Sequence, residues 1–391
     1  MLISLALVFL CGMALGEVFR RLKLPSLLGM IFTGILLGPH VLDMLDPVIM
    51  DISADLRQTA LIIILTRAGL SLDIEDLKRA GRPAMLMCFV PACLEIAGML
   101  ILGPALLGIS LLESAVLGTV IAAVSPAVVV PRMLNIMEEG YGASKSIPQM
   151  VMAGASVDDV FVIVLFTAFT CLARGGNITP EQFLSIPVSI ILGLVGGTAI
   201  GLALSHFFAR VHIRDSGKVI IILSLAFMLV TIENSLAGII GFSGLLAVMA
   251  LGARLKQGKC EVAGRLSKKF SKLWVGAEIL LFVLVGATVD TGYVLRAGIP
   301  SVALIFCVLL FRMAGVFLSL IRTPLNKKER IFSAFAYIPK ATVQAAIGGL
   351  PLAMGLACGD IVLTVAVLSI LITAPLGAAL VDATYKKLLV K

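Results

Sequence analysis

The stretch VIAAVSPAVVVPRM, residues 120–133, contains Pro126 and Pro131 inside an apolar run that extends over 113–134. A proline has no backbone N–H to donate, and its ring clashes with the preceding helical turn. We therefore expect the helix over 113–134 to be interrupted. Non-helical backbone at membrane depth is tolerated only where it is buried in protein or lines a watery cavity.

The composition places this chain in a membrane. Of its 391 residues, 60% are hydrophobic and only 14% are charged, whereas an average soluble domain has roughly 25% charged residues. This excludes an ordinary water-soluble protein and predicts an all-α polytopic membrane protein with about 13 transmembrane helices. The apolar runs that would form them are 2–19, 26–41, 56–72, 84–107, 113–134, 148–172, 183–209, 218–236, 238–253, 273–290, 298–321, 330–356 and 359–384.

The distribution of positive charge predicts the orientation in the membrane. If the amino terminus lies outside, the cations between apolar runs collect on the cytoplasmic side, and only Arg57, Arg174 and Arg296 fall outside. Lysine and arginine are enriched in cytoplasmic loops. We therefore expect an outside amino terminus and a cytoplasmic carboxyl terminus.

The longest connection, 254–272, is basic and amphipathic, which is typical of a linker at the cytoplasmic surface of the lipid. We expect one transmembrane domain over 1–391, which this linker divides into a first half, 1–253, and a second half, 273–391. The halves contain two interrupted helices and one helix with adjacent aspartates, at 113–134, 330–356 and 148–172 respectively.

The second interrupted run occurs seven segments after the first. Its stretch YIPKATVQAAIGGLP, residues 337–351, carries Pro339 and Pro351 with paired glycines between them. Runs an odd number of segments apart enter the membrane from opposite sides, which is typical of inverted-topology repeats. In such repeats two interrupted helices cross near the midplane and present free backbone groups to an ion. The alternative is a pair of kinked packing helices.

Two charged residues occupy nearly equivalent places in the proposed repeats. Glu95 lies 30 residues before Ser125 of the first break, and Arg312 lies 28 residues before Lys340 of the second. An unpaired charge at that depth costs several kcal/mol. We therefore expect an ion pair between Glu95 and Arg312 near the centre of the molecule, with separate partners for each as the alternative.

The strongest chemical signal is the pair Asp158 and Asp159 in GASVDDVFVIVLFTAF, residues 154–169, because no packing requirement explains two adjacent acids in an apolar run. Neighbouring side chains on a helix point about 100° apart, so one can face a watery cavity while the other faces a helix. Burial and mutual repulsion favour the protonated form of at least one. A salt-bridged helix contact is the alternative, and an expensive one.

The oxygen-rich surroundings of this pair predict a site for Na⁺ or Li⁺. The candidate ligands are Asp159, Asp158, Ser125 and Ser156, together with carbonyls freed at the first break. Soft-metal ligation is disfavoured because no Cys or His cluster lies nearby. Lys340 follows Pro339 directly, and we expect it to give electrostatic support at the second break; the alternative is a side chain that snorkels to the cytoplasmic face.

Four motifs carry a family resemblance: RAGLSLD (67–73), VSPAVVVPRML (124–134), SVDD (156–159) and PKATVQAAIG (339–348). In this order they resemble the monovalent cation:proton antiporter superfamily, in its branch with an Asp-Asp motif, and within it the NHA-type sodium/proton antiporters. The resemblance spans nearly the whole chain. It implies the NhaA/NapA-like antiporter fold, with inverted-topology repeats and two crossed discontinuous helices.

The resemblance also implies roles. Asp159 would be the main cation-binding carboxylate and Asp158 its partner. The segments with the breaks and their neighbours would form a core that moves against a dimerisation domain, in a homodimer of the cell (inner) membrane. Arg312 stands where better-known electrogenic members place a lysine, and a guanidinium stays charged, so it cannot carry a proton.

The number of protons per cation depends on which acids titrate. If Glu95 neutralises Arg312, both aspartates are free to titrate, which would allow two protons per sodium. If only Asp159 titrates, exchange is one for one and electroneutral, which the resemblance favours.

These observations predict a secondary antiporter that exchanges Na⁺ or Li⁺ for H⁺ by alternating access. No nucleotide-binding P-loop motif and no combination of nucleophile and base is present, so we expect neither an enzyme nor a cofactor. The expected partners are monovalent cations, protons, the lipid bilayer and a second copy, without nucleic acid. The alternatives are a K⁺/H⁺ antiporter of the same fold, a sodium-coupled organic-anion symporter, and a sensor or channel.

Overall fold

The computed structural model describes residues 1–71, 74–174, 180–236, 241–258, 260–289 and 291–391, without the side chains of 74–80, 156, 180–187, 234, 260 and 291–297. In this described part the regular elements are helices and no strand occurs. Nine of the described helices are long and apolar enough to cross a membrane. The predicted all-α membrane class is confirmed, while the count of about 13 spans stays a prediction.

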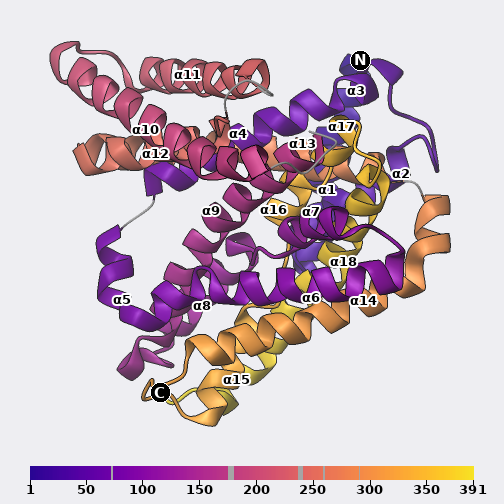
Figure 1. Ribbon diagram of the computed structural model, residues 1–391, viewed down its shortest axis with the longest axis vertical. Helices are drawn as coiled ribbons and strands as arrows, with labels where there is room; N and C mark the ends of the chain where they lie inside the picture. The colour runs from indigo at the N-terminus through magenta and orange to yellow at the C-terminus, as the bar shows by residue number, and fades with distance from the viewer. Residues whose placement is uncertain (72–73, 175–179, 237–240, 259, 290) are drawn as a thin grey trace. The chain divides into compact units, whose positions relative to one another are not determined.

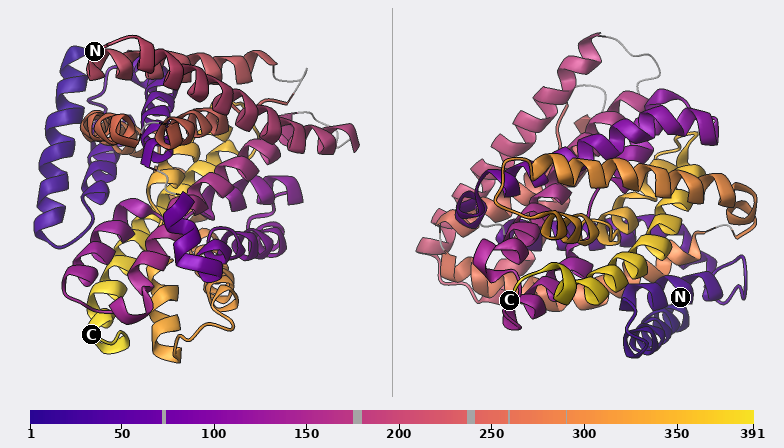
Figure 2. Two further views of the ribbon diagram at one scale, coloured as in Figure 1. Left: turned by 90° about the vertical axis from the view of Figure 1, so that its left-hand side faces the viewer. Right: turned by 90° about the horizontal axis from the view of Figure 1, so that it is seen from below.

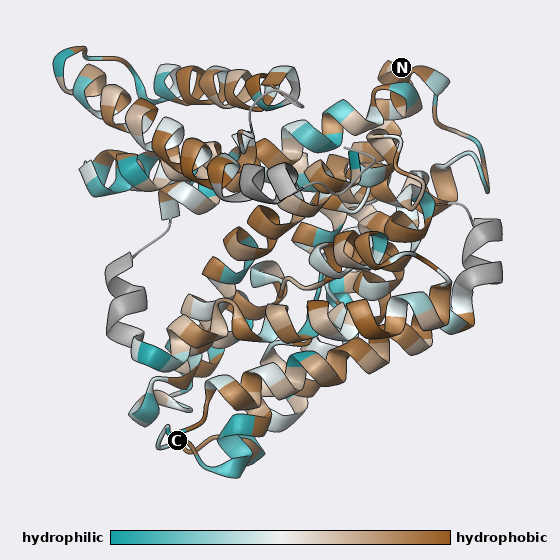
Figure 3. Cartoon of the chain, viewed as in Figure 1, coloured by the Kyte–Doolittle hydropathy of each residue, from teal (hydrophilic) through white to brown (hydrophobic). Residues whose placement is uncertain are grey.

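The chain forms two compact units. The first contains Met1–Ala54, Ile74–Val162 and Phe282–Lys391, and the second contains Asp55–Asp73 and Ile163–Leu281. Hydrophobic residues predominate along the helices of both (Figure 3). The predicted division into two halves at the linker 254–272 stays a prediction. Most of this linker is helical, since it contains the end of α12 (Gly244–Gly258) and the first turns of α13 (Cys260–Ala287).

The first unit contains the helices that surround the two breaks. Within it α6 packs along α14, and α1 pairs with α2 (Figures 1 and 2). Its elements are α1 (Leu2–Arg21), α2 (Ser26–Leu37), α3 (Pro47–Asp51), α5 (Ile74–Met87), α6 (Val90–Leu107), α7 (Leu111–Ile121), α8 (Pro126–Glu138), the first part of α9 (Ile147–Arg174), α14 (Thr291–Ser319), α15 (Lys327–Ala336), α16 (Thr342–Ile347), α17 (Leu350–Ala353) and α18 (Gly359–Leu388).

The second unit is built on α4 (Ser53–Ser71), α10 (Pro180–Arg210), α11 (Asp215–Leu236) and α12, together with the rest of α9 and most of α13. Here α10 packs along α12. The approach is close because α10 presents a glycine: a Cβ at Gly197 would lie 2.1 Å from the carbonyl oxygen of Ala247.

Both predicted interruptions are present. The first separates α7 from α8 over residues 122–125, and the second separates α15 from α16 over 337–341. The two breaks touch directly, because the backbone N–H of Ser125 donates to the carbonyl of Pro339 at 2.8 Å. The crossing of the two helices at this point stays a prediction.

The half-helices before the two breaks begin in the same way. Ser110 and Glu113 form a capping box at the start of α7, and Asn326 and Glu329 form another at the start of α15. A capping box satisfies two of the backbone N–H groups that a helix start leaves without an intrahelical partner. Each half-helix therefore has a defined start, and its other end points into the region of the breaks.

Candidate functional site

Asp158 lies on α9 inside the first unit and is completely buried. Its Oδ2 accepts two hydrogen bonds, one from the backbone N–H of Val124 in the first break at 2.8 Å and one from Nη2 of Arg312 at 2.8 Å. Its Oδ1 has no hydrogen-bond partner among the described residues. Both donors favour a negative charge on this oxygen, which opposes the cost of burying it.

Arg312 lies on α14 and is 1% exposed. Its Nε donates to the carbonyl of Tyr337 at 2.7 Å, and its Nη1 donates to Glu95 Oε2 at 2.9 Å and to the carbonyl of Ala122. Ala122 and Tyr337 are the first residues after α7 and α15. One guanidinium therefore binds the carboxyl ends of both half-helices, where carbonyls lack helical partners and a positive charge is favourable.

Glu95 on α6 and Lys340 in the second break are both completely buried. Lys340 Nζ lies 2.7 Å from Oε1 and 2.9 Å from Oε2 of Glu95, and it also donates to the carbonyl of Ile121 at the end of α7. Glu95 is thus held between the ammonium of Lys340 and the guanidinium of Arg312. The alternative that Lys340 snorkels to the membrane surface is wrong, because its side chain is enclosed by protein.

Glu95, Asp158, Asp159, Arg312 and Lys340 form a charged centre. Its charges almost balance. Arg312 and Lys340 face Glu95 and Asp158 at ion-pair distances. Asp159, the next residue on α9, has no cationic partner within ion-pair distance in the described part of the chain, and its buried Oδ1 lacks a hydrogen bond there. Asp159 is therefore the one acid of the five groups whose charge the centre does not neutralise.

The predicted cation ligands are only partly described. Ser125, 1% exposed, has a buried hydroxyl without a described hydrogen-bond partner. It follows Val124, which binds Asp158, so its hydroxyl belongs to the same neighbourhood. The side chain of Ser156 lies outside the described residues. No group of three or more His, Cys, Asp or Glu suited to a metal ion occurs among the residues that the structure describes.

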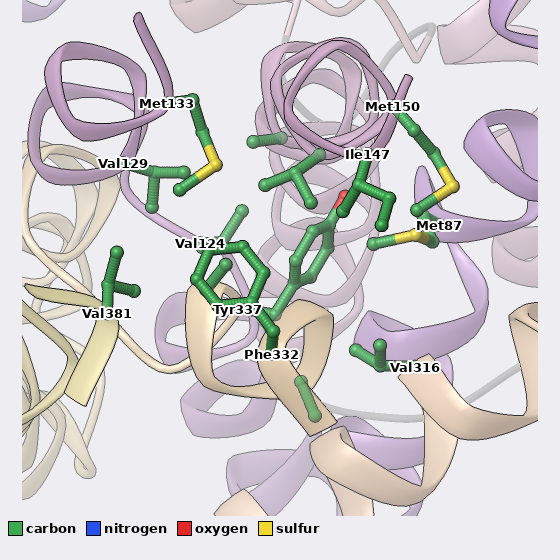
Figure 4. Close-up of a cluster of buried hydrophobic side chains, with 14 of the residues drawn as sticks. Met87, Val124, Val129, Met133, Ile147, Met150, Val316, Phe332, Tyr337 and Val381 are labelled. Carbon is green, nitrogen blue, oxygen red and sulfur yellow. The ribbon is translucent and has the colours of Figure 1, made fainter. Parts of the chain in front are cut away.

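A methionine-rich apolar cluster lies beside this centre. Met87, Met133 and Met150 pack there with Phe332 and the ring of Tyr337 (Figure 4). The hydroxyl of Tyr337 is buried without a described hydrogen-bond partner. A buried polar atom without a partner is unusual and costly. Sequence reasoning did not single out Tyr337, because an aromatic residue in an apolar run is ordinary packing material.

Two further polar residues complete the surroundings of the breaks. The amide of Gln344 on α16 donates to the carbonyl of Ala123 at 2.9 Å. The hydroxyl of Thr373 on α18 accepts a hydrogen bond from the backbone N–H of Lys340 at 3.0 Å. The only sequence signal for Thr373 was a hydroxyl in an apolar run, which more often bonds within its own helix.

Comparison with known proteins extends this description. The family profile described as "Sodium/hydrogen exchanger, transmembrane" matches residues 5–385. Sodium/hydrogen exchanger 9B2 of Mus musculus is 34% identical over 406 aligned residues, which cover 97% of this chain and 72% of that protein. Sodium/hydrogen exchanger 9B1 of Homo sapiens is 31% identical over 417 residues, covering 100% of this chain and 78% of that protein.

Among solved structures, the sodium proton antiporter MjNhaP1 from Methanocaldococcus jannaschii at pH 8 superimposes with a TM-score of 0.83. The alignment covers 98% of this chain and 97% of that one at 20% identity, so this similarity concerns the fold. With the family profile matching almost the whole chain, and with relatives above 30% identity, the chain belongs to the sodium/hydrogen exchanger family.

Proposed function

We propose that this protein is a secondary antiporter that exchanges Na⁺ or Li⁺ for H⁺, with Asp159 as the group that binds cation and proton in competition. The observation that carries the proposal is the charge arrangement around Asp159. The other four buried charges pair with one another, and Asp159 keeps a buried oxygen without a described partner. A carboxylate within a membrane-spanning helix must be neutralised, and either a proton or a monovalent cation does so.

Competition at one carboxylate is sufficient for exchange. If the site crosses the membrane readily when loaded with cation or proton, and rarely when empty, each cation moved one way requires a proton moved the other way. In alternating access the loaded site opens to the two faces in turn. Ser125, Ser156 and Asp158 would add oxygen ligands to a bound cation, in keeping with the preference of hard cations for oxygen.

Asp158 has a different role in this proposal. Its Oδ2 holds the N–H of Val124 in the first break and the guanidinium of Arg312, so protonation of the carboxylate would weaken an ion pair and a hydrogen bond. We infer that Asp158 stays ionised during the cycle and that one proton exchanges for one cation at Asp159. The homodimer, the outside amino terminus, the crossed breaks and the inner-membrane location belong to the same proposal.

Proton flux in proteoliposomes tests this function. Addition of Na⁺ or Li⁺ to the wild-type protein should move protons, and Asp159→Asn should abolish the movement because an amide cannot exchange a proton. Asp382→Asn is the matched control: Asp382 also pairs with an arginine, Arg132, but at the exposed end of α18, and this variant should transport normally. A wild-type protein that moves no protons in response to any monovalent cation would refute the antiporter.

The same assay separates the alternatives. Proton movement driven by K⁺ and not by Na⁺ would assign the potassium antiporter of the same fold. Sodium uptake that requires an organic anion and moves no protons would assign the symporter. The names of the relatives, sodium/hydrogen exchangers, support exchange of sodium for protons over both alternatives.

A further inference from the structure

Helix α18 carries a hydroxyl that binds the backbone of the second break. Thr373 is completely buried, and its Oγ1 accepts the hydrogen bond of the Lys340 N–H at 3.0 Å. The same hydroxyl donates to the carbonyl of Ser369 on its own helix at 2.7 Å. The break leaves the N–H of Lys340 outside any helix, so Thr373 supplies a partner that secondary structure does not.

A second contact lies one turn further along α18. A Cβ at Gly377 would come within 2.5 Å of Cγ of Pro339, so the proline ring packs directly against the backbone of α18. Residues four apart on a helix share a face. Thr373 and Gly377 therefore form one contact surface on α18, against which the two consecutive residues Pro339 and Lys340 pack.

This contact surface fixes the backbone of Lys340, while Glu95 binds its ammonium group. The backbone of Lys340 rests on Thr373, and its ammonium lies within 2.9 Å of both oxygens of Glu95. Glu95 Oε2 is shared with Arg312, and Arg312 also binds Asp158. A displacement of Lys340 would change how strongly Glu95 attracts Arg312, and so how strongly Arg312 binds Asp158.

We propose that Thr373 is a positioning residue for transport: by holding the backbone of Lys340, it sets the charge balance around the aspartate pair. This inference rests on the antiporter function proposed above. The charged groups that surround Lys340 are Glu95 of α6, Arg312 of α14 and Asp158 of α9. With Lys340 loosened, Glu95 and Arg312 lose a fixed partner, and Arg312 holds the Asp158 carboxylate less firmly in its place beside Asp159.

The expected effect is on cation affinity, more than on the maximal rate. In Thr373→Val, which keeps the shape and removes the acceptor, the apparent KM for Na⁺ should rise about fivefold, the ratio that corresponds to one lost hydrogen bond. Thr373→Ser keeps the acceptor and should restore the wild-type KM.

Thr384→Val is the matched control. Thr384 lies on the same helix, and its Oγ1 donates to the carbonyl of Leu380 at 2.6 Å in the same local pattern as Thr373 to Ser369. This variant loses a hydroxyl and an intrahelical bond without affecting the break, and it should keep the wild-type KM for Na⁺.

The outcomes distinguish failure of this inference from failure of the antiporter function on which it rests. If the wild type transports and Thr373→Val has the same KM for Na⁺ as Thr384→Val, Thr373 does not position Lys340. If Thr373→Val and Thr373→Ala both fail to fold while Thr384→Val folds, the hydroxyl serves stability and the inference is likewise overturned. A wild type without cation-driven proton flux refutes the proposed function itself.

Discussion

At the scale of one residue, the contacts of Arg312 explain why a guanidinium occupies the middle of the buried charge cluster. Its three nitrogens serve four acceptors: the carbonyls of Tyr337 and Ala122 and the carboxylates of Glu95 and Asp158. These acceptors surround it in different directions, and a planar fork with five N–H groups can reach them together. A lysine ammonium offers donors from a single atom.

We expect Arg312→Lys to keep the charge and still fail. At least one carboxylate or helix end would lose its donor, and breaking a buried ion pair costs about 3–5 kcal/mol. The melting temperature in detergent should fall, and cation-driven proton flux should drop at least about tenfold, in line with a loss of 1.4 kcal/mol or more. Wild-type values of both would show that charge alone is required at this position.

For a substitution of Tyr337 we expect the opposite effect on stability. Its buried hydroxyl has no described partner, and an unsatisfied buried polar group costs about 1–3 kcal/mol. Tyr337→Phe should therefore leave stability unchanged or raise it, which a thermal melt would detect. A clear fall in melting temperature would mean that the hydroxyl makes a stabilising bond, for example to a buried water.

At the scale of elements, α9 lies close to Tyr337, the first residue after α15, because α9 has a glycine at the point of contact. Gly154 on α9 has no side chain, and a Cβ there would lie 2.1 Å from the hydroxyl oxygen of Tyr337 and 3.0 Å from Cβ of Met87. Gly154 lies one turn before Asp158 on the same face of α9. The packing of Tyr337 against Gly154 thus helps to set the position of the helix that carries the aspartates.

Gly154→Ala should destabilise the protein by about 1–3 kcal/mol, the usual cost of overpacking a core. Because the shortest clash involves the tyrosine hydroxyl, adding Tyr337→Phe should recover part of the loss. A double-mutant cycle of unfolding midpoints measures this coupling. Strict additivity of the two changes would show that the residues do not touch in the folded protein.

For the whole molecule, the charge balance of the centre determines how many charges cross per cycle. Arg312 and Lys340 neutralise Glu95 and Asp158 in pairs, which leaves Asp159 as the single exchanging group in the proposed mechanism. A carrier that moves either one Na⁺ or one H⁺ on one carboxylate transfers no net charge in a full cycle.

Transport should therefore be insensitive to membrane potential. In proteoliposomes with K⁺ and valinomycin, imposing an inside-negative or inside-positive potential should leave the initial rate of Na⁺-driven proton flux unchanged. A rate that follows the imposed potential would mean that a second group, with Asp158 first among them, also exchanges its proton.

Much of this protein could be predicted before its tertiary structure was known. Local chemistry determines those features: apolar runs specify membrane helices, Pro126 and Pro339 remove backbone donors and interrupt two of them, and the adjacent Asp158 and Asp159 are conspicuous because the run around them is apolar. The predicted repeat of the two halves gave Glu95 and Arg312 equivalent positions, although they are far apart in the chain. The other inferences depend on residues close together in the chain.

Only the tertiary structure decided the partners of Asp158 and Lys340. Arg312 binds Asp158 across 154 residues of chain, and Lys340 binds Glu95 across 245. The position of Thr373 beneath Lys340 is equally nonlocal. Sequence patterns show that a buried charge needs a partner, but the partner depends on which helices pack together and at what rotation. Here that packing leaves Asp159, and not Asp158, as the acid whose charge is unpaired, because the single guanidinium of Arg312 is already bound to Asp158.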